Sequence, residues 1–230
     1  MPMRKALNRI KLLIFDLDDT LYPEIEYVKS GFSEISNKIF DKYGINKEQF
    51  YCNLLDEFKK KREEVFNRVL QKFNLFSEEL LNELIRIYRY HKPRISPYKD
   101  LVETIDMFKE KYHLGLISDG DKYRQILKLE SLGLLRYFEK CIFTNDLGPE
   151  YHKPSVKPFM DMVNHFNLST SEALYIGDNV EKDFYGPNQI GIFTVRIVKK
   201  GIYSRVKPKN RLYRQKLEIK SFHELAKYLK

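Results

Sequence analysis

Cysteine is scarce in this 230-residue sequence. Only Cys52 and Cys141 occur, and neither lies in a C-x-x-C pair or has a histidine at ligand spacing. This argues against a disulfide framework and against a structural zinc site, and it fits a reducing compartment. No apolar run approaches the roughly eighteen residues that a membrane span needs. The first apolar run is short and meets acids at once, which is unlike a signal peptide. We therefore expect a cytoplasmic protein with no membrane partner.

Internal repeats and low-complexity segments are also missing, and the composition is that of a folded chain. It is 43% hydrophobic and 14% aromatic, enough for a full core in one or two domains. The net charge is +9, from 41 basic and 32 acidic residues. A lysine-rich solvated surface explains this charge, while an anionic substrate or nucleic acid are alternative explanations. Residues 199–216 hold eight basic residues, which we interpret as a solvated loop, with anion contact as the alternative.

Residues 24–91 have apolar side chains at alternating steps of three and four, the spacing of one helix face. Ser77 is placed to cap the last of these helices, and Pro93 and Pro97 end the helical stretch. About seventy residues of helix without a strand signal indicate an inserted helical module. The apolar stripes are Val28, Phe32, Ile35 and Ile39, then Phe50, Leu54 and Phe58, then Val65, Val69 and Phe73, and finally Leu80, Leu84 and Ile87.

Strand patterns alternate with helix patterns in the remainder, which predicts a parallel sheet covered on both faces. The fold class is therefore α/β: a Rossmann-like doubly wound parallel sheet core with an inserted all-α domain. We assign residues 1–22 and 95–230 to the core and residues 23–94 to the helical insert. The strands are expected at 10–17, 113–118, 140–145, 172–178 and 192–198, and the helices at 121–133, 154–167 and 182–191.

The predicted helix at 121–133 has an apolar side that includes Leu127 and Leu132, and Gly133 is placed to end it.

Polar residues follow four of these strands, at the edge of the sheet where sites gather in such folds. Singly, each has an ordinary explanation as a helix cap, a turn or a solvated lysine. Together they indicate one site. They are Asp16, Asp18, Asp19 and Thr20 after the first strand, Ser118, Asp119 and Gly120 after the second, Lys153 in the loop after the third, and Asp178 and Asp183 after the fourth.

This set of motifs resembles the haloacid dehalogenase-like superfamily over nearly the whole chain. The family's D-x-D-x-T matches residues 16–20, its Ser/Thr matches Ser118, its lysine matches Lys153, and its G-D-x-x-x-x-D matches residues 177–183. The helical insert resembles the α-helical cap that the family places between its first two motifs. The resemblance implies a phosphatase, because dehalogenase relatives lack an acid at the position of Asp18.

Two residues depart from the commonest family pattern. Asp119 stands where many relatives have asparagine, and an extra negative charge near a phosphate needs a cationic neighbour or an outward orientation. Pro187 stands where alanine is commoner, and it fits the first turn of a helix, where a missing N–H costs little.

The residues have the chemistry that the resemblance implies. Asp16 is the expected nucleophile, forming an aspartyl-phosphate, and Asp18 the expected general acid and base. A carboxylate that attacks an anionic phosphate needs a cation, and Mg²⁺ prefers such oxygen ligands. We assign Mg²⁺ to Asp16, Asp178 and the backbone carbonyl of Asp18, with Asp183 supporting it from further out. Lys153 and the metal neutralise charge on the phosphoryl oxygens.

Other residues of the motifs are expected to bind phosphate or to shape the loops. Ser118 and the N–H groups of Asp119 and Gly120 hold the phosphoryl group. Thr20 fixes the first loop, and Asp19 is structural.

These assignments predict a magnesium-dependent phosphatase of a small phosphorylated metabolite, a sugar phosphate or a nucleoside monophosphate. One alternative is a phosphomutase, which is less favoured because mutases must exclude water after phosphoryl capture and the sequence shows no device that does so. The other is a binding or regulatory protein that uses its basic segment on nucleic acid. The complete set of site residues counts against that alternative, so we do not expect a nucleic-acid partner. We expect a monomer or homodimer, and a substrate chosen by the cap and by contacts with Tyr22, Pro23 or Glu24.

Overall fold

The computed structural model describes residues 2–201 and 203–229. The chain forms two compact units: Met1–Glu24 together with Ser96–Lys230, and Ile25–Ile95. The first unit contains the sheet and the second is helical. The role of the helical unit as a cap stays a prediction.

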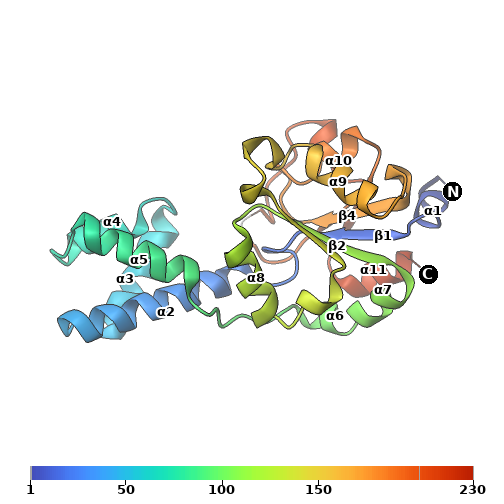
Figure 1. The fold of residues 1–230 in the computed structure, drawn as a ribbon. Helices are drawn as coiled ribbons and strands as arrows, with labels where there is room; N and C mark the ends of the chain where they lie inside the picture. The colour runs from blue at the N-terminus through green and yellow to red at the C-terminus, as the bar shows by residue number, and fades with distance from the viewer. Residues whose placement is uncertain (1, 202, 230) are drawn as a thin grey trace. The chain divides into compact units, whose positions relative to one another are not determined.

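The first unit is built on a six-stranded parallel sheet with the order β3-β2-β1-β4-β5-β6. The chain builds outward from β1 to β3, then crosses back and continues from β4 to β6 on the other side (Figure 1). The connections that leave β1 and β4 therefore run in opposite directions along the sheet. Open α/β sheets bind ligands at such a switch point. The strands are β1 (Leu12–Phe15), β2 (His113–Ser118), β3 (Lys140–Phe143), β4 (Ala173–Gly177), β5 (Phe193–Ile197) and β6 (Leu217–Ile219).

Helices cover both faces of the sheet, as the apolar strands require. Figure 1 shows α9 and α10 on one side of the sheet and α7 and α11 on the other. The helices of this unit are α1 (Pro2–Leu7), α6 (Lys99–Val102), α7 (Ile105–Lys111), α8 (Lys122–Ser131), α9 (Lys157–His165), α10 (Tyr185–Gln189) and α11 (Phe222–Tyr228). Short 3₁₀ turns lie at Leu135–Tyr137, Thr144–Asp146, Pro149–Tyr151, Thr170–Glu172 and Arg211–Tyr213.

Strand β1 is buried on both faces because its successive side chains enter two different cores. Leu12 and Ile14 belong to a cluster that includes residues of α9. Phe15 points to the other face, where its ring centroid lies 5.9 Å from that of Phe138 and 6.2 Å from that of Phe222. This double burial fixes β1 in the centre of the sheet.

The predicted strands and helices match this sheet, with five elements that the sequence reading missed. These are α1, α6, α7, β6 and α11, which are too short or too polar to show a clear period. Pro187 lies in the first turn of α10, as predicted.

The inward face of α8 differs from its prediction. Leu132 is buried at the helix end and Gly133 has a φ of +68°, as a C-terminal glycine should. Leu127, however, is only partly buried, while Gln125 and Lys128 are buried. The prediction was wrong here because it identified the inward face of the helix by its apolar residues alone.

The second unit has a core of its own, made by the predicted apolar stripes. Ser77 caps its last helix, with its hydroxyl accepting a hydrogen bond from the Leu80 N–H at 3.2 Å. Residues from every stripe pack into one cluster, among them Phe32, Leu54 and Val69. The helices of this part are α2 (Glu24–Tyr43), α3 (Lys47–Lys60), α4 (Val65–Lys72) and α5 (Glu78–Tyr90). Among the described residues, no helix is long and apolar enough to cross a membrane.

Truncating β1 should therefore destabilise the sheet. Leu13 is fully buried, whereas Leu147 is 47% exposed, so the same change to alanine tests burial alone. We expect Leu13→Ala to lower the free energy of unfolding by about 2–5 kcal/mol and Leu147→Ala by about 0.5 kcal/mol or less. Urea unfolding followed by circular dichroism measures both. Similar losses in the two variants would contradict the central place of β1.

Candidate active site

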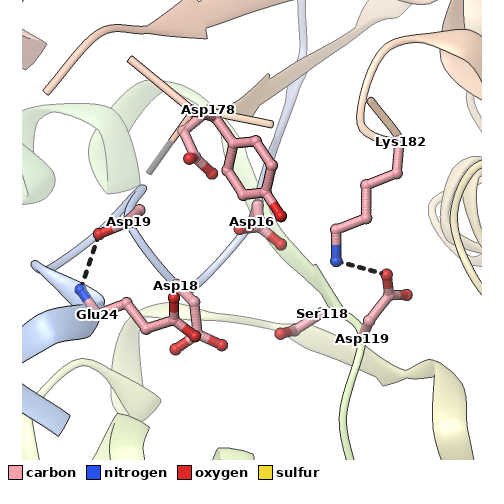
Figure 2. A pocket seen from close by; sticks show the side chains of 9 residues that line it. Asp16, Asp18, Asp19, Glu24, Ser118, Asp119, Asp178 and Lys182 are labelled. Carbon is pink, nitrogen blue, oxygen red and sulfur yellow. Dashed lines mark hydrogen bonds and ion pairs between the residues drawn. The ribbon is translucent and has the colours of Figure 1, made fainter. Parts of the chain in front are cut away.

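A small cavity of about 140 Å³ lies at the carboxyl edge of the sheet, beyond β1, β2 and β4. Figure 2 shows that the carboxyl groups of Asp16 and Asp178 face this hollow, with Ser118 and Asp119 on one side. Four strand ends were predicted to meet here, and three of them line the cavity directly. The lining residues are Asp16, Asp18, Asp19, Glu24, Ser118, Asp119, Asp178, Lys182 and Tyr203.

Asp16 is the first residue after β1, and it is nearly buried, with 6% of the residue exposed. Its Oδ1 lies 2.5 Å from the Lys153 ammonium, and its Oδ2 accepts a hydrogen bond from the Thr20 hydroxyl at 3.4 Å. Burial raises the pKa of Asp16 to about 7, against the opposing effect of Lys153. Thr20 thus holds the carboxyl itself as well as the loop.

Lys153 lies behind the cavity, where it joins the ends of β1 and β4. Its ammonium donates to Asp16, to Asp183 at 2.8 Å and to the Tyr175 hydroxyl at 3.0 Å. Burial disfavours this ammonium, but Asp16 and Asp183 raise the pKa of Lys153 well above its usual range. The fourth predicted strand end, the loop after β3, therefore reaches the site through a buried charge.

Asp16, Asp178 and Asp183 form a buried group in which one carboxylate oxygen of each lies within 4.8 Å of the others. Burial and the neighbouring acids, Asp183 first, raise the pKa of Asp178 well above its usual range. Gly177 makes this crowding possible, because a Cβ there would lie 2.5 Å from the Asp183 carboxylate. Three hard oxygen donors of this kind fit Mg²⁺.

The Asp18 carboxylate is held apart from this group by three donors. Its Oδ1 accepts hydrogen bonds from Lys128 at 2.7 Å and from the Tyr22 hydroxyl, and its Oδ2 accepts from the Gln125 amide at 3.2 Å. Burial alone would raise the pKa of Asp18, but Lys128 and these hydrogen bonds lower it to about 2. Tyr22, expected to touch substrate, is instead fully buried against Asp18.

Asp119 has the cationic neighbour that the sequence called for. Its carboxylate accepts hydrogen bonds from Lys182 and from the Thr144 hydroxyl, both at 2.8 Å, and from the Lys153 backbone N–H at 3.2 Å. Burial opposes its ionisation, yet Lys153 and Lys182 lower the pKa of Asp119 to about 2. The side chain thus ties loops together, which leaves its N–H group for the predicted phosphate contact.

The predicted phosphate-binding residues Ser118 and Gly120 lie beside Gln125. The Ser118 hydroxyl accepts a hydrogen bond from the Gln125 amide at 2.6 Å. Gly120 has a φ of +157°, and a Cβ there would lie 2.9 Å from the Gln125 side chain. This position therefore requires glycine.

Asp19 shapes the first loop, as predicted for a structural residue. It adopts a φ of +53°, and its carboxylate accepts a hydrogen bond from the Glu24 N–H at 2.8 Å (Figure 2). Gly201 packs against it, because a Cβ there would lie 2.8 Å from the Asp19 carboxylate. Tyr203 lines the cavity nearby. The start of the basic segment therefore lies at the site, while its later basic residues, from Arg205 onward, are exposed.

Four functional candidates were missed by sequence reasoning. Gln125 and Lys128 show a signal in retrospect, since polar residues three apart share a helix face with buried Leu129 and Leu132. Lys182 occupies one of the unspecified positions of G-D-x-x-x-x-D, so the motif assigned it no role. Tyr203 gave no signal, because a loop has no period from which to read its inward side.

Comparisons with known proteins agree with this geometry. A model of the haloacid dehalogenase-like hydrolase family matches residues 13–197. The glyceraldehyde 3-phosphate phosphatase of Methanopyrus kandleri is 28% identical over 210 residues, covering 87% of this chain and 89% of that protein. The protein of the same name from Methanocaldococcus jannaschii is 29% identical over 198 residues, covering 83% and 86%. A solved structure of an HAD phosphatase from Thermococcus onnurineus is 27% identical with a TM-score of 0.63, covering 96% of this chain and 98% of that chain.

The raised pKa of Asp16 predicts that metal-free protein gains stability on acidification. Asp16 titrates at about 7 in the folded chain and near 4 in an unfolded one. The folded state therefore binds the extra proton between these values, and lowering the pH stabilises it. In EDTA, we expect the wild-type melting temperature to rise by a few degrees from about pH 8 to about pH 5.5, and less in Asp16→Asn. Scanning calorimetry measures this, and equal rises would contradict the assignment.

Proposed function

The chain belongs to the haloacid dehalogenase-like hydrolase family, and we propose that it is a magnesium-dependent phosphatase of a small sugar phosphate. The convergence of carboxylates and a serine from separate strand ends on one cavity, with Lys153 paired to Asp16 behind it, carries this proposal. A carboxylate nucleophile and a second carboxylate two residues later suit hydrolysis in two displacements.

Asp16 would attack phosphorus, forming its O–P bond as the bond from phosphorus to the ester oxygen breaks. Asp18 would give its proton to the leaving oxygen and then take one from the water that attacks the aspartyl-phosphate. This second displacement releases phosphate and frees the Asp16 carboxylate. The two chemical steps thus begin and end with Asp18 protonated.

Asp18 is ionised in the substrate-free chain, because Lys128 and the other donors lower its pKa to about 2. It must therefore take up its proton when substrate binds. An anionic phosphoryl group beside it favours this uptake, since a like charge disfavours ionisation.

The charge of the cavity supports the metal requirement. Six lining residues carry a carboxyl group, and Lys182 is the cation among the lining residues. We propose that Asp16, Asp178 and the backbone carbonyl of Asp18 hold Mg²⁺, with Asp183 behind them. Bound there, Mg²⁺ would neutralise carboxylate and phosphoryl charge and so allow the two anions to approach.

Other residues would position the phosphoryl group. Ser118 would hold it together with the N–H groups of Asp119 and Gly120, at the turn that precedes α8. Lys153 would favour the ionised form of Asp16 against the effect of burial and would orient it, because its ammonium lies 2.5 Å from that carboxylate.

A short sugar phosphate is the substrate that we propose. The two curated relatives described above are named as phosphatases of glyceraldehyde 3-phosphate, a triose phosphate. The cavity of about 140 Å³ suits a phosphoryl group and little more. We propose that residues 23–94 act as the cap that selects the rest of the substrate.

Removing the nucleophile should abolish turnover. We expect Asp16→Asn to lower kcat by about a thousandfold or more, because no other group can form the covalent intermediate. Asp106→Asn, which changes an exposed carboxylate on α7, should keep wild-type activity. Phosphate release with Mg²⁺ is measured over triose, pentose and hexose phosphates and nucleoside monophosphates. Full activity of Asp16→Asn, or isomer conversion without phosphate release, would contradict the proposal, and a preference for nucleotides would contradict the substrate class.

Magnesium should stabilise the wild-type protein by relieving carboxylate repulsion. We expect Mg²⁺ at a hundred times its dissociation constant to add about 2.7 kcal/mol to the free energy of unfolding. Asp178→Asn removes one proposed ligand, so its melting temperature should rise much less, while Asp106→Asn should respond like the wild type. An equal rise in wild type and Asp178→Asn would mean that the metal binds elsewhere.

A further inference from the structure

Helix α8 presents two polar side chains to the protein interior, although apolar residues ordinarily fill such a face. Gln125 is fully buried, and Lys128 is 4% exposed. They lie three residues apart and hence on one side of the helix. Neither belongs to the motifs recognised in the sequence.

Both side chains donate hydrogen bonds to the Asp18 carboxylate. Lys128 binds its Oδ1 at 2.7 Å, and Gln125 binds its Oδ2 at 3.2 Å. The two oxygens are therefore held from one helix, which restricts rotation of the carboxylate about its Cβ–Cγ bond. The Tyr22 hydroxyl also donates to Oδ1, from the loop that carries Asp18.

Gln125 also links Asp18 to the proposed phosphate-binding loop. The same amide nitrogen donates to the Ser118 hydroxyl at 2.6 Å. Gly120 leaves space for the Gln125 side chain, because a Cβ at that position would lie 2.9 Å from it. The relative position of Asp18 and Ser118 thus depends on one buried amide.

Stability alone gives a weak reason for this arrangement. Taking a lysine and a carboxylate out of water costs several kcal/mol for each ion, and an apolar pair of similar size often serves as well. A lysine on one oxygen of the Asp18 carboxylate and an amide on the other instead fix its orientation, and proton transfer is sensitive to orientation.

We propose that Gln125 and Lys128 are positioning residues that aim the Asp18 carboxyl at the leaving oxygen. This inference rests on the proposed phosphatase activity and on Asp18 as its general acid. Lys128 faces the negative charge that Asp18 acquires when it has given its proton to that oxygen. Gln125 keeps the carboxyl in register with the phosphoryl group held at Ser118.

The test uses esters that differ in their need for a proton. Glycerol phosphate, an alkyl ester, and phenyl phosphate have basic leaving groups that need a proton. The leaving group of 2,4-dinitrophenyl phosphate departs without protonation. We expect Lys128→Met to lower kcat by about a hundredfold for the basic leaving groups and by less than about fivefold for dinitrophenyl phosphate. Lys122→Met, which changes an exposed lysine at the start of α8, should leave the whole series unchanged. Gln125→Leu keeps the ion pair and should show the same pattern with a smaller loss.

A double-mutant cycle then separates positioning from a general structural effect. The loss of kcat in Asp18→Asn should depend on the leaving group in the same way. Adding Lys128→Met to Asp18→Asn should lower kcat little further, because Lys128 acts through Asp18. Additive losses, or an equal loss for every ester in both Lys128→Met and Gln125→Leu, would overturn the positioning role. A wild-type chain that hydrolyses no ester in the series would contradict the proposed function instead. Circular dichroism confirms that each variant is folded.

Discussion

The pairing of Lys153 with the carboxylates between β1 and β4 is the interaction on which the rest of the site depends. Asp16, Asp178 and Asp183 are buried within a few ångströms of one another, so each disfavours the charge of the others. The Lys153 ammonium contacts two of them and makes part of this charge tolerable. The remaining excess of negative charge is what the proposed Mg²⁺ would neutralise. Without Lys153, the acids would need additional protons or a cation to stay together.

Lys153 is itself held in place by a loop that depends on another part of the site. Its backbone N–H donates to Asp119, whose carboxylate also accepts from Lys182 and Thr144. One carboxylate therefore connects the loops that follow β2, β3 and β4. The motifs that appear separate in the sequence form a single network of charge and hydrogen bonds, in which displacement of one loop affects the others.

The sequence predicted the fold and most of the proposed chemistry because the residues concerned lie at strand ends. Asp16, Ser118 and Asp178 are located by the apolar runs before them, and parallel strands bring such ends to one edge. Lys128 could not be predicted in this way, because the inward side of α8 is polar where it meets Asp18. Tyr203 was also unpredictable, since its position depends on how a loop of several residues folds back toward Asp19. Strand periodicity gives no information about either tertiary contact.

The strand order also affects how the protein can acquire its active site. Leu12 pairs with His113 on one side and with Ala173 on the other. Strand β1 is thus completed by β2 and β4, which are synthesised much later, so its apolar residues and the acids that follow it stay unpaired until those strands are made. Such long-range pairings slow folding. A nascent chain that lacks β4 has neither the carboxylate of Asp178 nor a partner for one edge of β1, so the loop that carries Asp16 and an apolar strand edge are exposed together until residues 173–177 are made.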